Sequence, residues 1–238
     1  MMSAERYRKH YFPLESNPDV FTDLVHKLGV SPTLRFQDVF TLDELELLPR
    51  PALALILIFP TSEAYESQKA KEEAMYEEYV GSTEEEEVVW FKQTINNACG
   101  LYAMLHAVCN GDARNFIHTG SLLATLLDTC SPRERTLALE TSEELESAYA
   151  TAAKQGDSTA PANAEDEVDF HFVCFAKSNK NAHVYELDGD RKGPIDRGAL
   201  LGPNDDMFAE GVLGIVREFI QRERGESSGF SLMALVPR

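Results

Sequence analysis

Cys99 is the residue of this sequence best placed for covalent chemistry. It stands at the beginning of an apolar, helix-like pattern that runs to Asn110. At the start of a helix, unpaired backbone N–H groups and the positive end of the helix dipole favour a thiolate over a thiol. A buried, inert cysteine is the alternative for such a residue considered alone. The position therefore predicts a nucleophile if the surrounding residues can support one.

Gln93, six residues before Cys99, could supply such support. A loop between the two would bring the glutamine amide beside the sulfur. Together with the backbone N–H of Cys99, that amide would form an oxyanion hole, in which one donor contributes about 10²- to 10³-fold in rate. Considered alone, Gln93 could equally be a surface amide. The pair is typical of acyl transfer to a cysteine.

The base must come from elsewhere in the chain, which has six histidines. Residues 170–176 and 183–187 predict two strands joined by the polar turn 177–182. If these strands form a hairpin, Ala176 pairs with His183. Five residues further out on each strand, other side chains then lie directly opposite each other.

That register places His171 opposite Asp188, with Cβ atoms about 4.5 to 5.5 Å apart. A carboxylate beside an imidazole fixes its tautomer and favours the imidazolium, which a nucleophile and base pair requires. The alternative is that His171 is an ordinary strand residue and that Asp188 is the first residue of an Asp188-Gly189 turn. The other histidines are less suited: His26 and His106 lie on helix faces, His10 and His118 lie in polar surroundings, and His183 has no expected carboxylate opposite it.

Capping residues and apolar periodicity predict the elements that must position these side chains. Asn17 caps a helix that begins at Pro18 and ends before Gly29. The segment 52–59 is apolar on both faces, as in a central strand covered by helices. The remaining predictions are a brief helix opened by a Thr41 and Glu44 capping box, helices over 63–79, 99–110, 121–128 and 207–221, one helix opened by Ser131, Pro132 and Glu134, and strands over 34–40 and 230–236.

The composition limits the classes of function. The 238 residues include 22 Lys and Arg against 40 Asp and Glu, a formal charge of −18, which is too acidic for a protein that binds nucleic acid through phosphates. The longest apolar run is far shorter than the roughly 20 residues that cross a membrane. The acidic stretch 61–87 is either a solvated face or a surface for a basic partner.

No secretory signal pattern opens the chain, so we expect a cytoplasmic location, or a nuclear one, with free thiols. The four cysteines have no zinc-site spacing, and we expect neither a metal nor an organic cofactor. Residues 154–166 are rich in small and acidic residues and predict a mobile loop. Without a clear boundary elsewhere, residues 1–238 are expected to form a single domain and a monomer.

Three segments carry a resemblance to a known family. Gln93-Thr-Ile-Asn-Asn-Ala-Cys99-Gly100, the segment 168–173 around His171, and the segment 185–189 ending in Asp188-Gly189 resemble the signature of the ubiquitin carboxyl-terminal hydrolase family of cysteine peptidases. The segments 13–18, 49–51 and 217–219 resemble the same family in the same order. The resemblance thus covers essentially the whole chain.

The resemblance implies a catalytic role for each candidate. Cys99 would be the nucleophile, His171 the general base and acid, Asp188 the orienting carboxylate and Gln93 the oxyanion donor. It also implies an α+β fold like that of papain, with a mostly antiparallel central sheet flanked by helices and a knotted backbone. Residues 150–168 correspond to the family's active-site crossover loop.

The implied reaction is removal of small adducts or precursor extensions from the C-terminal glycine of ubiquitin, through a thioester acyl-enzyme. Ubiquitin is then the expected partner. Two alternatives remain open at this stage: the same chemistry on a ubiquitin-like modifier, and a module that binds ubiquitin without turning it over.

Overall fold

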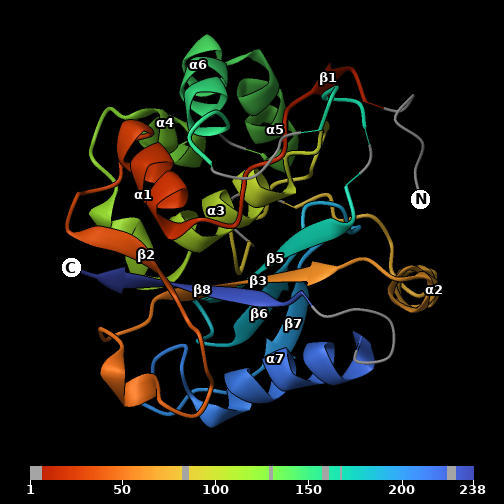
Figure 1. Ribbon diagram of the computed structural model, residues 1–238. Helices are drawn as coiled ribbons and strands as arrows, with labels where there is room; N and C mark the ends of the chain where they lie inside the picture. Colours follow the sequence, from red (N-terminus) through yellow and green to blue (C-terminus); the bar gives the residue numbers. More distant parts are fainter. Residues whose placement is uncertain (1–6, 82–85, 129–130, 157–160, 167, 224–228) are drawn as a thin grey trace.

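The computed structural model describes residues 7–81, 86–128, 131–156, 161–166, 168–223 and 229–238. A six-stranded antiparallel sheet lies at the centre, in the order β2-β8-β3-β5-β6-β7 (Figure 1). Its strands are β2 (Leu34–Asp38), β3 (Ala54–Pro60), β5 (Phe170–Lys177), β6 (Val184–Leu187), β7 (Ile195–Gly198) and β8 (Ser231–Pro237). The expected α+β class with a mostly antiparallel sheet is confirmed.

Helices cover both faces of this sheet. In Figure 1, α1 and α3 to α6 lie on one side, α7 lies on the other, and α2 stands beyond one edge. The helices are α1 (Pro18–Lys27), α2 (Glu63–Glu73), α3 (Cys99–Cys109), α4 (Leu122–Asp128), α5 (Pro132–Thr141), α6 (Glu143–Ala152) and α7 (Glu210–Glu223), and two 3₁₀ helices span Leu45–Leu47 and Gly111–Phe116.

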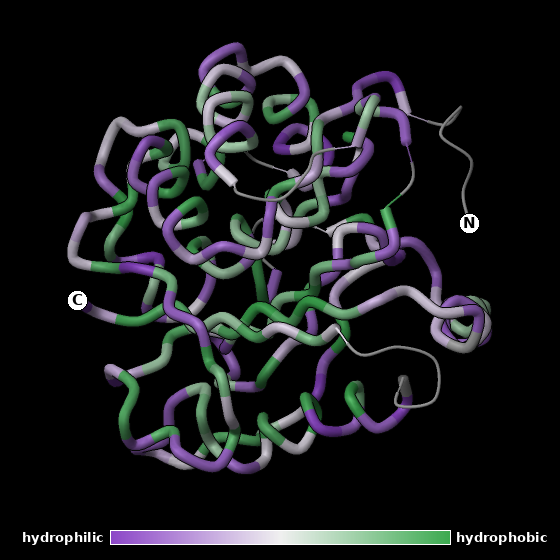
Figure 2. The backbone as a smooth tube through the Cα atoms, in the orientation of Figure 1, coloured by the Kyte–Doolittle hydropathy of each residue, from purple (hydrophilic) through white to green (hydrophobic). Residues whose placement is uncertain are grey.

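The central strand β3 shows why the sheet needs helices on both sides. All seven of its residues are buried, and the strand appears as a hydrophobic band across the middle of Figure 2. Ile56 faces the core that contains α1 and α3, whereas Leu57 faces the core that contains α7. This alternation follows from the two-residue period of a strand.

A short parallel pair holds the approach to the nucleophile. The strand β1 (Lys9–His10) pairs with β4 (Ile95–Asn96), which lies directly before the start of α3. The backbone N–H of Tyr11 extends the pair by donating to the carbonyl of Asn96 at 3.1 Å. The N-terminal segment therefore packs on the turn that carries Cys99.

The predicted hairpin register is wrong by two residues. Ala176 pairs with Tyr185 and not with His183. The ladder continues to Ser178, whose backbone N–H donates to the carbonyl of His183 at 2.8 Å, and the Ser178 hydroxyl accepts from the N–H groups of Lys180 and Asn181 inside the turn. Because side chains alternate with a period of two, this shift leaves His171 and Asp188 on the same face.

Two helix predictions need correction. The Thr41 and Glu44 capping box does not form, since Thr41 Oγ1 accepts from the N–H of Asp43 and the 3₁₀ helix that follows has no side-chain cap. Helix α2 ends at Glu73, not at Tyr79, because Lys192 binds both the carboxylate and the carbonyl of Glu73. Tertiary contacts thus override local helix preference at this end.

The elements that were not predicted are α6, β7, the short strands β1 and β4, and the 3₁₀ helix Gly111–Phe116. Helix α6 extends to Ala152, so the expected loop over 150–168 begins inside a helix. Residues 153–156 and 161–166 contain no helix or strand, and residues 157–160 and 167 lie outside the described part of the chain. The mobility of this loop stays a prediction.

Candidate active site

The start of helix α3 presents Cys99 to a cavity. Cys99 is the first residue of the helix, and the N-cap residue Ala98 makes no side-chain bond to the helix end. Backbone N–H groups in a first helical turn have no partner within the helix. Because every residue of α3 is buried, those N–H groups and the thiol lie in a site shielded from bulk water.

Two other cysteines lie in surroundings that keep them inert. Burial raises the pKa of the Cys109 thiol to about 12. Burial also raises the pKa of the Cys174 thiol well above its ordinary value. A thiol that stays protonated is a poor nucleophile. Cys130 lies outside the described residues.

His171 connects the thiol to a carboxylate. It is the second residue of β5; its Nε2 lies 2.9 Å from Oδ1 of Asp188, and the Cys99 thiol lies close enough to help raise the pKa of the imidazole. Burial opposes a charged imidazole, but the charge of Asp188 and the contacts with Asp188 and Cys99 outweigh it and raise the pKa of His171 to about 10. The imidazole is therefore held as an imidazolium at neutral pH.

The aromatic residues Phe59 and Tyr65 flank this imidazole. The ring of Phe59 meets it edge-on, with centroids 5.9 Å apart, and the centroid of the Tyr65 ring lies at 6.3 Å. Both rings pack in the core on the α7 side of the sheet. They restrict the orientations that His171 can adopt.

Asp188 follows strand β6 and is almost fully buried. Burial would favour its neutral form, but the charge and proximity of His171, the charge of Lys69 and the N–H of Asp190 hold its pKa far below its ordinary value. The Tyr65 hydroxyl donates to Oδ2 at 3.3 Å, and the N–H of Asp190 donates to Oδ1 at 2.9 Å. The carboxylate is thus both charged and fixed in orientation.

Helix α2 anchors the turn that carries this carboxylate. Lys69 forms an ion pair with Asp190, and Arg191 Nη1 lies 2.8 Å from Glu72 Oε2. Both contacts join α2 to the residues directly after Asp188. The helix therefore positions the acid of the site from the edge of the sheet.

Gln93 lies beside the same turn. Its backbone N–H donates to the carbonyl of Gly189 at 2.8 Å. A Cβ atom on Gly189 would lie only 3.0 Å from the Gln93 Cβ and from the Phe91 carbonyl oxygen, so this close approach requires glycine. The Gln93 amide donates to the carbonyl of Ile95 at 3.2 Å. Among the described contacts none joins Gln93 to Cys99, and its oxyanion role stays a prediction.

The sequence interpretation missed two residues of this site, Tyr65 and Asn97. Asn97, two positions before the nucleophile, has a φ of 57°, in the left-handed region that asparagine tolerates better than most residues. Its amide donates to the carbonyls of Ala164 and Asp166. An asparagine directly before a helix start was the one available signal for Asn97; nothing local marked Tyr65.

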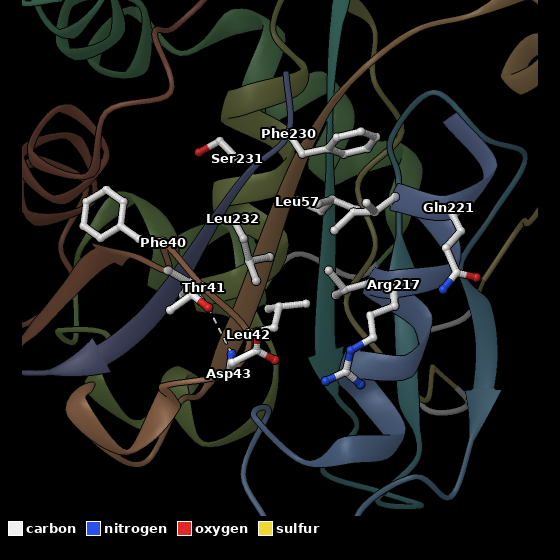
Figure 3. Close-up of a pocket in the computed structure, with 13 residues that line it drawn as sticks. Phe40, Thr41, Leu42, Asp43, Leu57, Arg217, Gln221, Phe230, Ser231 and Leu232 are labelled. Carbon is white, nitrogen blue, oxygen red and sulfur yellow. Dashed lines mark hydrogen bonds between the residues drawn. The ribbon is translucent and has the colours of Figure 1, made fainter. Parts of the chain in front are cut away.

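Two hollows near the start of β8 share lining residues. A cavity of about 640 Å³ is lined by Cys99, Asn97 and Pro161 among others. A second hollow of about 400 Å³, shown in Figure 3, lies between the segment 39–43 and helix α7. Phe230 and Ser231 line both hollows. The other lining residues lie on opposite faces of the sheet: Leu57 and Leu232 line the second hollow on the α7 side, whereas Ile58 and Phe172 line the cavity at Cys99 on the α3 side.

His106 and His183 lie in surroundings different from that of His171. His106 is wholly buried, and burial lowers its pKa to about 4, so it stays neutral; it does not lie on an exposed helix face. The expectation that His183 has no carboxylate partner is wrong, since its Nδ1 lies 2.9 Å from Asp196 Oδ2. Asp196 belongs to the unpredicted strand β7. This second His-Asp pair is exposed and has no contact with a cysteine among the described residues.

The described residues contain no cluster of three or more His, Cys, Asp or Glu arranged to hold a metal ion. Within the same part of the chain, no helix is both long and apolar enough to cross a membrane.

Comparisons with known proteins identify the family of this chain. The family described as "Ubiquitin carboxyl-terminal hydrolase, family 1" matches residues 11–221. Ubiquitin carboxyl-terminal hydrolase isozyme L1 of Rattus norvegicus is 35% identical over 94% of this chain and 96% of its own length. Ubiquitin carboxyl-terminal hydrolase of Drosophila melanogaster is 38% identical over the same shares of the two chains.

A solved structure has the same fold. The Trichinella spiralis UCH37 catalytic domain, crystallised bound to ubiquitin vinyl methyl ester, aligns with a TM-score of 0.70 at 24% identity and covers 99% of each chain. The family match spans most of the sequence and includes the segments that carry Cys99, His171 and Asp188. The chain belongs to ubiquitin carboxyl-terminal hydrolase family 1 and is a cysteine-type hydrolase.

Proposed function

We propose that this enzyme releases small adducts and precursor extensions from the C-terminal glycine of ubiquitin, with Cys99 as nucleophile, His171 as acid and base, Asp188 as orienting carboxylate and Gln93 as oxyanion donor. The observation that carries the proposal is the 2.9 Å contact between His171 Nε2 and Asp188 Oδ1, together with the nearness of the Cys99 thiol to the same imidazole. Cys99, His171 and Asp188 come from three separate segments of the sequence.

The reaction begins with a thiolate and imidazolium pair. The Cys99 sulfur attacks the carbonyl carbon of the substrate's terminal glycine, and the carbonyl oxygen becomes an oxyanion. Backbone N–H groups at the start of α3 and the amide of Gln93 are the donors proposed to stabilise this charge. Such donors act strongly here because the site is buried.

Collapse of this intermediate divides the substrate. The imidazolium of His171 gives its proton to the leaving amine, the carbon–nitrogen bond breaks, and a thioester to Cys99 remains. The neutral imidazole then takes a proton from water, which attacks the thioester carbonyl. The carbon–sulfur bond breaks, ubiquitin leaves with a free carboxylate, and the thiolate and imidazolium pair returns.

We propose that the folded body of ubiquitin binds at the hollow of Figure 3. Phe40 is 88% exposed at its edge. An exposed aromatic beside a concave, partly apolar surface is typical of a binding site for another protein. Phe230 and Ser231 at the start of β8 belong to both hollows, and we propose that the tail of a body seated there passes these residues on its way to Cys99. The charge of −18 would favour encounter with the basic tail of ubiquitin.

The segment between α6 and β5 supports a preference for small leaving groups. Residues 153–156 and 161–166 of this segment lie beside the cavity at Cys99, and Ala153, Gly156 and Pro161 line it. A flexible strand of about 18 residues has a mean span of roughly 23 Å. A peptide passes under such a strand more easily than a folded domain. We also propose that the enzyme works as a monomer in the cytoplasm, or in the nucleus, where thiols stay reduced.

Ubiquitin with an electrophile in place of its C-terminal carboxylate tests the function. We expect a covalent adduct on Cys99 that is lost in Cys99→Ala and kept in Cys174→Ala, the matched change of a buried thiol. Binding without an adduct would instead indicate a silent binding module. An adduct formed faster with a ubiquitin-like protein carrying the same electrophile would reassign the substrate.

A further inference from the structure

Asn97 occupies an unusual position for a residue next to a nucleophile. It is only 9% exposed, its φ is 57°, and it is joined to Cys99 by the single residue Ala98. Its side chain lines the cavity at Cys99. A strained, buried polar residue at such a place needs partners for its amide.

Those partners are backbone atoms of the segment between α6 and β5. The Asn97 Nδ2 donates to the carbonyl of Ala164 at 2.9 Å and to the carbonyl of Asp166 at 2.8 Å. Both amide protons are thus used on one short segment. Because the acceptors are carbonyls, the Asn97 side chain supplies both donors, and the side chain of Asp166 acts on the contact only by closing the turn that presents these carbonyls.

The segment that accepts these bonds is itself a closed turn. The N–H of Asn163 donates to Asp166 Oδ2 at 2.9 Å, and the N–H of Asp166 donates back to the carbonyl of Asn163 at 3.2 Å. Asn97 therefore holds a formed turn rather than a loose strand. Pro161, two residues before this turn, lines the same cavity.

We propose that Asn97 is a specificity-determining residue that latches the turn 163–166 to the turn of the nucleophile and thereby limits the size of the leaving group. The inference rests on the proposed function, because it assumes that the leaving group passes through the cavity at Cys99. A thin leaving group passes with both amide bonds intact. A folded leaving group must push the 163–166 turn away and break both bonds.

The same side chain would also affect the position of the Cys99 nucleophile. Release of the turn frees the amide of a residue only two positions from Cys99, so the same side chain that sets the width of the cavity also stiffens the backbone that carries the sulfur. Loss of the Asn97 amide and opening of the 163–166 turn should each widen the passage for the leaving group. Only loss of the Asn97 amide should also loosen the nucleophile.

Two variants separate these effects. Asn97→Gly removes the amide but keeps a residue that adopts positive φ without strain. Asp166→Ala opens the 163–166 turn and leaves residue 97 intact. Ala182→Gly is the matched control, because Ala182 also has a positive φ, of 61°, but lies in the distant β5–β6 hairpin turn.

The experiment measures kcat/KM on two substrates, ubiquitin carrying a small fluorogenic amide and ubiquitin joined through its C-terminus to a second folded ubiquitin. We expect the ratio of the folded to the small leaving group to rise at least about tenfold in Asn97→Gly and Asp166→Ala, and to stay at the wild-type value in Ala182→Gly. Limited proteolysis within residues 153–166 should also become faster in the first two variants.

An unchanged ratio in Asn97→Gly, or an equal loss on both substrates, would overturn the latch and leave Asn97 a structural residue. Failure of the proposed function looks different, since wild type would then cleave neither substrate and would form no adduct at Cys99.

Discussion

His171 Nε2 lies 2.9 Å from Asp188 Oδ1 although the two residues are not directly opposite in the β5–β6 ladder. The last residue of β6, Leu187, pairs with Cys174, so Asp188 reaches His171 diagonally along the same face. Diagonal neighbours lie about 7 to 8 Å apart, within reach of a histidine and an aspartate side chain. The contact between His171 and Asp188 thus depends on the turn after β6 as much as on the strands.

Asp188→Asn should move the pH dependence of the reaction. Without the carboxylate charge, the pKa of His171 falls from about 10, by about one to three units. Since His171 must carry a proton to protonate the leaving group, the alkaline limb of kcat/KM should shift to lower pH. The rate at pH 7 should fall about 10²- to 10⁴-fold.

The pH profile on a fluorogenic ubiquitin amide measures both effects. Asp196→Asn, which alters the exposed His183 pair, is the control and should keep the wild-type profile. An alkaline limb at the same pH in Asp188→Asn would contradict the assigned cause of the His171 shift.

Alkylation should select Cys99 among the described thiols. At pH 7.5, iodoacetamide should modify Cys99 at least about 10²-fold faster than Cys109 or Cys174, because burial raises the pKa of the latter two. Peptide mass spectrometry over a time course gives the three rates. Comparable rates in the folded enzyme would show that burial does not protect Cys109 and Cys174.

Tyr65→Phe should lower kcat without raising KM. The change removes the hydroxyl that donates to Asp188 Oδ2 at 3.3 Å and keeps the ring beside His171. We expect a loss of about fivefold, the equivalent of about 1 kcal/mol. Tyr185→Phe removes a hydroxyl from the exposed Asp196 instead and should have no effect on kcat. Equal kinetics for the two variants would remove Tyr65 from the set of positioning residues.

Gly189→Ala should separate Gln93 from the Asp188 turn. The added Cβ would lie 3.0 Å from both the Gln93 Cβ and the Phe91 carbonyl oxygen, which should cost about 1 to 3 kcal/mol of stability and reduce kcat. Gly214→Ala in α7 is the matched control, since a Cβ there meets nothing within 4 Å. The control should gain about 0.5 to 1 kcal/mol through helix propensity. Denaturant unfolding and kcat together check this prediction, which is wrong if Gly189→Ala is silent in both.

Phe40→Ala should weaken substrate binding alone. The side chain is 88% exposed at the edge of the Figure 3 hollow, so its loss should leave the unfolding midpoint unchanged. KM for a ubiquitin substrate should rise about fivefold, as for an interface residue worth about 1 kcal/mol. Leu137→Ala changes another exposed apolar residue, on α5, and should leave KM as it is. A matching rise in the control would show a general surface effect.

Local chemistry explains which parts of the fold were predictable. The Asn17 cap accepts from the N–H groups of Asp19 and Val20, and α1 begins at Pro18 as expected. The helix beginning at Cys99 and the strands of the catalytic hairpin were also predicted. In each case residues that are close in the sequence determine the local structure.

The parts that were missed depend on distant partners. The Ser178 hydroxyl that closes the hairpin turn also donates to the carbonyl of Glu87, 91 residues away. The end of α2 contacts Lys192, which is 119 residues away. Asn97 is explained only by carbonyls at 164 and 166. A single sequence cannot show such pairings, because they appear only once the chain has folded.

The pairing of β1 with β4 has a practical consequence. Lys9 and His10 lie against Ile95 and Asn96, one residue short of the Asn97 latch. A protease that trims the chain past residue 10 would thus strip a supporting strand from the turn of the sulfur while leaving every triad side chain in place. Clipping at this end offers a way to silence the enzyme that an inventory of its active-site residues would not reveal.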